Sequence, residues 1–230
     1  MDFNIIASNL GLYFQGLWTT VWLVAAALAL GMCLSVPLAI LRTSPNRLLN
    51  WPVWAYTYFF RGTPLLVQLF MIYYGLSQFE AVQNSFMWPL LRQAWFCCLF
   101  AFTLNTAAYT TEILRGAIEV TPAGEVEAAK AAGMSPMLML RRIILPSAFR
   151  RALPGYGNEV IFMLHGSAVA SVVTLIDLTG AARLVQSRTY APYEAFITAA
   201  LFYLVLTFAL VWLFRQLEHR MHAHLRRPVA

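Results

Sequence analysis

Five stretches of this chain contain no charged residue, and each is roughly as long as a helix that crosses a membrane. They are residues 3–41, 62–79, 93–111, 160–176 and 195–214. A membrane-spanning helix needs roughly 20 mostly apolar residues. Charged residues make up only 11% of the chain and hydrophobic residues 60%, whereas globular domains carry roughly 25% charge. The sequence therefore predicts an all-α integral membrane protein.

We expect five membrane-spanning helices in a single domain that covers residues 1–230. Their approximate bounds are residues 14–41, 55–79, 93–117, 156–176 and 194–215. Connections between them are short, apart from a charged loop at residues 121–150. The chain has no clear internal repeat and no low-complexity linker, so nothing in it indicates a second domain.

The charged loop contains a segment with its own helix signals. Residues 127–146 read EAAKAAGMSPMLMLRRIILP, in which the first six residues favour a helix and Gly133 is a plausible stop. Ser135 is placed to cap a second helix, Pro136 to begin it and Pro146 to end it. The pattern predicts two short helices joined by a turn, which we call the bracket.

The distribution of basic residues predicts the orientation of the chain. With the bracket in the cytoplasm, twelve basic residues lie inside and three outside. The twelve are Arg42, Arg47, Arg115, Lys130, Arg141, Arg142, Arg150, Arg151, Arg215, Arg220, Arg226 and Arg227, and the three are Arg92, Arg183 and Arg188. The N-terminus is then outside and the C-terminus inside. Arg61 is left over at the edge of the second span, where we expect its side chain to extend toward the cytoplasmic headgroups.

The net charge of +6 follows from this asymmetry. Lipids of the cytoplasmic leaflet attract basic residues at helix ends. The arginines are scattered, without the clustered basic and aromatic surface that nucleic-acid binding needs. We therefore expect membrane lipid as a partner and no nucleic acid.

Several stretches resemble a known family. Residues 58–70 (YFFRGTPLLVQLF), 102–125 (FTLNTAAYTTEILRGAIEVTPAGE) and 153–171 (LPGYGNEVIFMLHGSAVAS) are similar to the polar amino acid permeases of bacterial ABC importers. Seven bracket residues match the EAA loop of such permeases: Glu127, Ala128, Ala129, Gly133, Ile143, Leu145 and Pro146. The resemblance covers nearly the whole chain. It implies the type I ABC importer permease fold in the bacterial inner membrane.

The resemblance also implies partners. Transport would need a second permease subunit, alike or paralogous, together with two cytoplasmic ATP-binding subunits and an extracytoplasmic solute-binding protein. The bracket would couple the permease to the ATPases, with Arg141 and Arg142 docking on acidic groove residues; membrane-surface anchoring is the alternative role for both arginines. No P-loop of the form GxxxxGKS or GxxxxGKT occurs, so ATP and Mg²⁺ would bind the partner. We expect no cofactor, metal site or catalytic residue in this chain, which would be a transporter subunit and not an enzyme.

Polar residues of the third expected span form one candidate site. Asn105, Tyr109 and Glu112 recur at helical spacing and so share one face. A carboxylate at membrane depth costs roughly 2.5–3.5 kcal/mol on insertion scales, so Glu112 needs a partner or a wet cavity. Tyr109 and Glu112 are candidates for the wall of a translocation path. A structural pair between Glu112 and Arg115 is the alternative.

A second candidate group begins the fourth expected span. Asn158 and Glu159 follow a run of Pro and Gly residues, and no basic residue lies within a helical turn beyond Glu159. An unpaired carboxylate there would attract a cationic ligand. His165 shares a face with Asn158 and could hydrogen-bond a substrate, although it could also be a packing residue. Ser167 completes this set of candidate substrate-binding residues.

The same region bears on the substrate class. Many permeases of the family have Lys-X-Thr-Ser-Leu where this chain reads HGSAV at residues 165–169. Loss of the lysine with retention of Glu159 would make the cavity more negative. This favours arginine, lysine, ornithine or histidine, and octopine-like arginine derivatives fit equally well. A permease for glutamine or glutamate is the alternative.

Two other classes of protein fit less well. A secondary transporter runs on ion gradients without the bracket and usually has more spans and inverted repeats. An intramembrane protease would need a nucleophile and a base. His165 and Ser167 point to different helix faces, and no GxSxG elbow is present.

Overall fold

The computed structural model describes residues 3–221, which form helices joined by short connections. In chain order the α-helices are α1 (Phe3–Arg42), α2 (Arg47–Gly62), α3 (Leu65–Phe70), α4 (Glu80–Gln83), α5 (Trp88–Leu91), α6 (Ala94–Glu119), α7 (Ala123–Ala131), α8 (Pro136–Met139), α9 (Leu145–Gly166), α10 (Leu178–Thr189) and α11 (Pro192–Met221). Two π-helical turns are η1 (Met71–Gly75) and η3 (Leu140–Ile144), and two 3-10 turns are η2 (Leu76–Gln78) and η4 (Ser167–Val173). No strand occurs within residues 3–221, in agreement with the expected all-α class. Arg226 and Arg227, which the expected orientation counts, lie outside the described residues.

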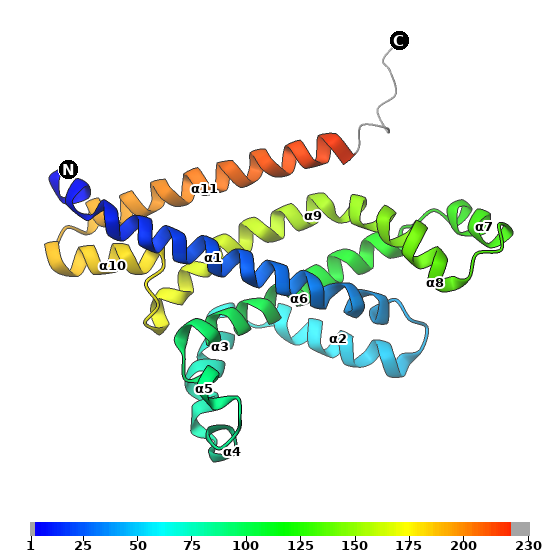
Figure 1. Ribbon diagram of the computed structural model, residues 1–230, viewed down its shortest axis with the longest axis horizontal. Coiled ribbons are helices and arrows are strands. Elements are labelled where there is room, and N and C mark those ends of the chain that lie inside the picture. The colour runs from blue at the N-terminus through cyan, green and yellow to red at the C-terminus, as the bar shows by residue number, and fades with distance from the viewer. Residues whose placement is uncertain (1–2, 222–230) are drawn as a thin grey trace, which may run out of the picture.

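The long helices α1 and α6 form the centre of the bundle (Figure 1). α9 and α2 pack against α6, α10 packs against α1, and α11 lies on α9 and α10. α1 and α6 approach closely at Gly31, where an added Cβ would lie 2.5 Å from Cγ2 of Thr106. A small residue therefore sets the distance between these two helices, as is common where helices pack in membranes.

Three buried apolar clusters follow one another along α1. The first joins α1, α10 and α11 around Tyr13. The second joins α1, α6 and α9 around Phe102, and the third joins the same three helices around Leu114 at their bracket end. Alanine occurs in all three clusters, which allows the helices to approach closely.

Length and hydropathy identify two helices that are able to cross a membrane, Asn4–Arg42 and Pro192–Met221. A third candidate is the bent pair Pro136–Val173 and Leu178–Thr189, whose axes differ by 47°. α6 agrees with the expected third span to within two residues at each end. The short helices α4, α5 and α10 were not expected. The number of five spans stays a prediction.

The second expected span, residues 55–79, is not one unbroken helix. α2 ends at Gly62, Thr63 has the extended conformation φ −116°, ψ 143°, and α3 begins after Pro64. The residue before a proline is disfavoured in helical conformation, and proline has no N–H for the helical ladder. The chain therefore breaks at this point. α3 packs against α6, and α4 and α5 project away from the bundle (Figure 1).

The first part of the bracket agrees with the prediction. α7 ends at Ala131, and Gly133 has φ +72°, a left-handed conformation that glycine adopts without steric cost. The Ser135 hydroxyl accepts a hydrogen bond from the backbone N–H of Leu138 at 3.4 Å and so caps α8. The stop and the cap are both confirmed.

Pro146 does not end the second helix of the bracket, contrary to the prediction. The helix continues from Pro136 through η3 and α9 to Val173. A proline within a helix removes one hydrogen bond and crowds the carbonyl four residues earlier, here that of Arg142. The π-helical turn η3 ends at Ile144, two residues before Pro146, and changes the hydrogen-bond pattern at this point. The second helix of the bracket and α9 are therefore continuous.

The bracket and the last turns of α11 lie at one end of the bundle (Figure 1). The first turns of α1 lie at the opposite end, beside α10. The first turns of α1 and the last turns of α11 thus lie toward opposite ends of the bundle (Figure 1).

Candidate functional site

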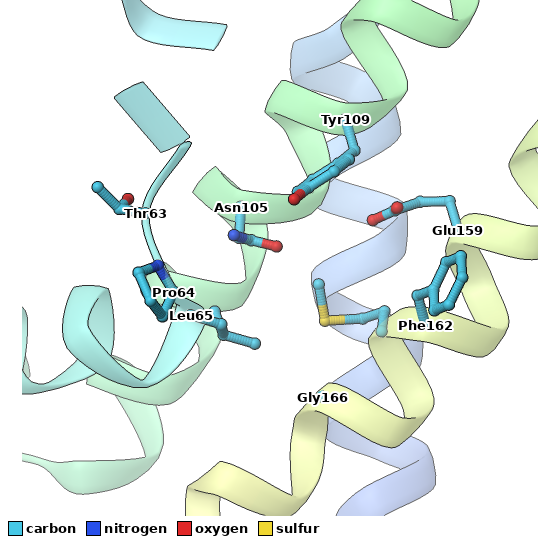
Figure 2. A pocket seen from close by; sticks show the side chains of 9 residues that line it. Thr63, Pro64, Leu65, Asn105, Tyr109, Glu159, Phe162 and Gly166 are labelled. Atoms are coloured by element: carbon cyan, nitrogen blue, oxygen red, sulfur yellow. The ribbon is translucent and has the colours of Figure 1, made fainter. Parts of the chain in front are cut away.

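A pocket of about 390 Å³ lies where the break between α2 and α3 faces α6 and α9 (Figure 2). It is lined by Thr63, Pro64, Leu65, Asn105, Tyr109, Glu159, Phe162, Met163 and Gly166. Three segments far apart in the sequence therefore build one cavity. Its walls are mostly apolar, with a few polar groups that could orient a ligand, as is usual for small-molecule sites.

Gln68 of α3 holds the helix break in place. Its side-chain amide donates to the carbonyls of Phe60 at 2.8 Å and Thr63 at 2.9 Å, and to the Thr63 hydroxyl at 2.7 Å. These carbonyls have lost helical partners because α2 ends here. Oε1 of Gln68 accepts a hydrogen bond from Nδ2 of Asn105 at 2.9 Å, which ties α6 to the break.

Gln68 was missed in the sequence analysis. The signal that could have found it is an isolated amide four residues after Pro64 in an apolar segment. A buried polar side chain beside a helix break is well placed to bind the freed backbone groups.

Glu159 supplies the carboxylate of the pocket. The residue is only 6% exposed, and Figure 2 shows its side chain directed from α9 toward α6. Thr106 of α6 lies beside it, and the positive charge of Arg61, on α2, acts on it. The sequence places no basic residue close to Glu159 along its own helix, and only the tertiary structure brings a cation near it. A buried carboxylate is costly unless a counter-charge or ligand offsets its desolvation.

Glu112 is not among the residues that line this pocket within the described part of the chain. Its Oε1 accepts hydrogen bonds from Nε of Arg42 at 3.2 Å and from the Thr57 hydroxyl at 3.0 Å. Its Oε2 accepts from Nε of Arg115 at 2.7 Å. The carboxylate thus ties α1, α2 and α6 together, an arrangement that extends the structural pair considered from the sequence. The three polar residues expected on one face of α6 therefore have different roles: Asn105 and Tyr109 line the pocket, whereas Glu112 does not.

Three other candidates lie outside the pocket as described for residues 3–221. Nε2 of His165 lies 3.0 Å from the hydroxyl of Thr207, so His165 faces α11. The Ser167 hydroxyl is buried and donates to the Leu164 carbonyl at 2.7 Å. Asn158 is exposed on α9. The structure therefore does not bring these three side chains together with Glu159.

The bracket encloses a second cavity, a groove of about 750 Å³ between α7 and the continuous helix. Among the expected coupling residues, those that line it are Ala128, Ala129, Arg142, Ile143 and Pro146. Glu127 and Arg141 are exposed and Leu145 is half-buried, while Gly133 forms the turn. The guanidinium groups of Arg141 and Arg142 are therefore accessible to a partner.

Arg151, which the sequence analysis counted only as a basic residue, ties the start of α9 to α6. Its Nε donates to the Ala117 carbonyl at 3.1 Å and its Nη2 to the Thr121 hydroxyl at 2.7 Å. Its Nη1 donates to the Ser147 hydroxyl at 2.6 Å. One guanidinium thus links α9 to the end of α6 and to the start of the charged loop.

Comparison with known families gives a match over residues 31–223 to the model described as "Binding-protein-dependent transport system inner membrane component". The chain belongs to this family. The permease is 42% identical over 230 residues to the nopaline transport system permease protein NocM of Agrobacterium fabrum, with 100% of this chain and 95% of NocM covered. It is 46% identical over 215 residues to the histidine/lysine/arginine/ornithine transport system permease protein HisM of Salmonella typhimurium, with 93% and 92% covered.

Solved structures agree with this assignment. A crystal structure of an amino acid ABC transporter with histidines matches the permease with a TM-score of 0.85 and 34% identity, over 96% of this chain and 99% of that chain. Inward-facing structures of the MetNI methionine ABC transporter match with a TM-score of 0.75 at 18% identity, which shows a shared fold. The resemblance to polar amino acid importer permeases and the type I permease fold are thereby confirmed. The relatives of this chain are permease subunits, which are transporters and not enzymes.

Proposed function

We propose that this permease carries basic amino acids, or the related opines, across the bacterial inner membrane into the cell. Relatives of similar identity are named for nopaline, octopine and the histidine/lysine/arginine/ornithine group. All of these compounds carry a group that is, or can become, cationic. That shared feature supports a cation-binding site in the permease.

The observation that carries this proposal is the position of Glu159 on the wall of the pocket. A carboxylate in a poorly hydrated site attracts a cationic ligand far more strongly than it would in water. A neutral glutamine side chain would gain little from it, and glutamate would be repelled. The charge therefore favours a basic substrate over the glutamine or glutamate alternative.

The proposed importer contains two permease subunits, alike or paralogous, two ATP-binding subunits and an extracytoplasmic solute-binding protein. ATP and Mg²⁺ would bind the ATP-binding subunits. The bracket would dock on these subunits with Arg141 and Arg142 at the contact, and five spans would place the N-terminus outside and the C-terminus inside.

The continuity of the bracket with α9 supports a mechanism of alternating access. Nucleotide binding would move the bracket, and the helix from Pro136 to Val173 would carry that movement to Glu159. Hydrolysis would return the helix to its first position. The pocket would thus face opposite sides of the membrane in the two states.

The proposal is tested with the importer reconstituted in proteoliposomes with its binding protein. We expect arginine, lysine or histidine to stimulate ATP hydrolysis and uptake. Glu159→Gln should reduce uptake at least tenfold, which corresponds to about 1.4 kcal/mol. Glu119→Gln removes the same charge from an exposed surface pair and should leave uptake within about twofold of the native value.

Stimulation by glutamine or glutamate would move the permease to the alternative substrate class. Uptake of basic amino acids that is indifferent to Glu159→Gln would assign the cation site to another residue or subunit.

A further inference from the structure

Arg61 is held at the edge of the pocket by Tyr109. Its Cζ lies 5.4 Å from the centroid of the Tyr109 ring, within the range of a cation–π contact. The Tyr109 hydroxyl donates to the Arg61 carbonyl at 3.3 Å. Side chain and backbone of Arg61 are thus both in contact with a residue that lines the pocket. The guanidinium therefore lies over the ring of Tyr109, on α6.

The charges of Arg61 and Glu159 flank the pocket without neutralising each other. Within residues 3–221, neither side chain takes part in an ion pair shorter than 4 Å, although the charge of Arg61 acts on Glu159. Glu112, by contrast, binds two arginines directly. Arg61 is exposed, so its donors are available. A guanidinium binds a carboxylate through two parallel hydrogen bonds.

We propose that Arg61 binds the α-carboxylate of the substrate while Glu159 binds its cationic group. This inference rests on the proposed function and names the chemistry of the same pocket: a free amino acid with a carboxylate at one end and a positive charge at the other. A volume of about 390 Å³ is in the range of small-molecule sites. His165 faces α11, whereas Arg61 contacts the pocket residue Tyr109 and so is the basic side chain that the proposal uses.

The test is direct ligand binding to the purified complex of permease and ATPases, without the binding protein, so that only the permease selects. The ligands are L-arginine and agmatine, which is arginine without its carboxylate. The native complex should bind arginine at least tenfold more tightly than agmatine. Arg61→Gln should weaken arginine binding at least tenfold and change agmatine binding by less than twofold.

Two further variants separate a binding role from a structural one. Arg61→Lys keeps the charge without the bidentate fork and should bind arginine with intermediate affinity. Tyr109→Leu removes the ring beneath Arg61 and should weaken arginine binding while agmatine binding changes little. Arg47→Gln removes an exposed charge at the other end of α2 and is the matched control.

The outcomes separate this inference from the proposed function. If Arg61→Gln weakens the binding of arginine and agmatine equally, or affects neither, the role of Arg61 is overturned. The proposed function survives that result if Glu159→Gln still weakens the binding of both ligands. Failure of the native complex to bind either cationic ligand would overturn the proposed function and this inference together.

Discussion

At the scale of residues, the neighbours of a buried polar group decide its role. Gln68 and Glu112 are largely enclosed in the bundle, and hydrogen bonds across helices satisfy both. Glu159 is as deeply buried and borders a cavity instead. The same type of side chain is therefore structural at residue 112 and available to a ligand at residue 159.

Replacement of Gln68 tests the structural role of the helix break. Gln68→Ala removes the amide that binds the Phe60 and Thr63 carbonyls and leaves the Asn105 amide only its 3.5 Å contact with the Phe60 carbonyl, at a cost of about 2 kcal/mol or more in the free energy of unfolding. Thermal unfolding of the purified complex should show a lower midpoint than the native protein.

The control is Gln78→Ala. The side chain of Gln78 is exposed, and its amide donates a hydrogen bond to the Tyr74 carbonyl at 3.4 Å, so water can replace this bond. We expect its midpoint to match the native value. Equal midpoints for the two variants would contradict a special role for Gln68 at the break.

At the scale of elements, one continuous helix joins the two cavities of the permease. The helix from Pro136 to Val173 lines the bracket groove at its first turns and the pocket further along. Arg151 of this helix lines the groove and binds the end of α6 at the Ala117 carbonyl and the following loop at the Thr121 hydroxyl. A force applied at the bracket would therefore act on both α9 and α6.

Arg151→Lys tests this connection. A lysine has no planar fork and cannot reproduce three hydrogen bonds in three directions, each worth roughly 1 kcal/mol. We expect ATP hydrolysis to continue while the amount of substrate transported per ATP falls severalfold. Simultaneous measurement of hydrolysis and uptake in proteoliposomes gives this ratio.

The control for this experiment is Arg47→Lys, at an exposed arginine near the start of α2, which should keep the native ratio. A parallel decrease of hydrolysis and uptake in Arg151→Lys would indicate general destabilisation and would contradict a coupling role.

At the scale of the whole molecule, the chain forms a bundle with two distinct ends. The bracket and the turn between α1 and α2 lie at one end, and the turn between α10 and α11 lies at the other (Figure 1). Five spans would place all the expected cytoplasmic segments at the bracket end. This agreement supports the proposed orientation without deciding the number of spans.

Cysteine labelling tests the orientation. Single cysteines would be introduced at exposed positions, after Cys33, Cys97 and Cys98 have been replaced by alanine. A membrane-impermeant maleimide added to cells with a permeabilised outer membrane should label Ser8→Cys, Asn84→Cys and Tyr190→Cys. Asn46→Cys and Ser135→Cys should react only after the inner membrane is opened. Labelling of Ser135→Cys from outside would reverse the expected topology.

The sequence by itself determined the helical class, the family and the turn of the bracket. These features depend on local signals: long apolar runs, a glycine at positive φ in Gly133 and a serine cap at Ser135. Pro146 was misread because the proline rule assumes regular α-helical hydrogen bonds, and η3 replaces them.

Only the tertiary structure decided which polar side chains share a cavity. The direction of a side chain depends on how its helix is rotated against its neighbours, and one residue along a helix turns it by about 100°. Glu159 therefore faces the pocket while Asn158 next to it is exposed and His165 contacts α11. The meeting of Gln68 with Asn105, and of Arg61 with Tyr109, likewise requires helices that pack side by side, which no local pattern records.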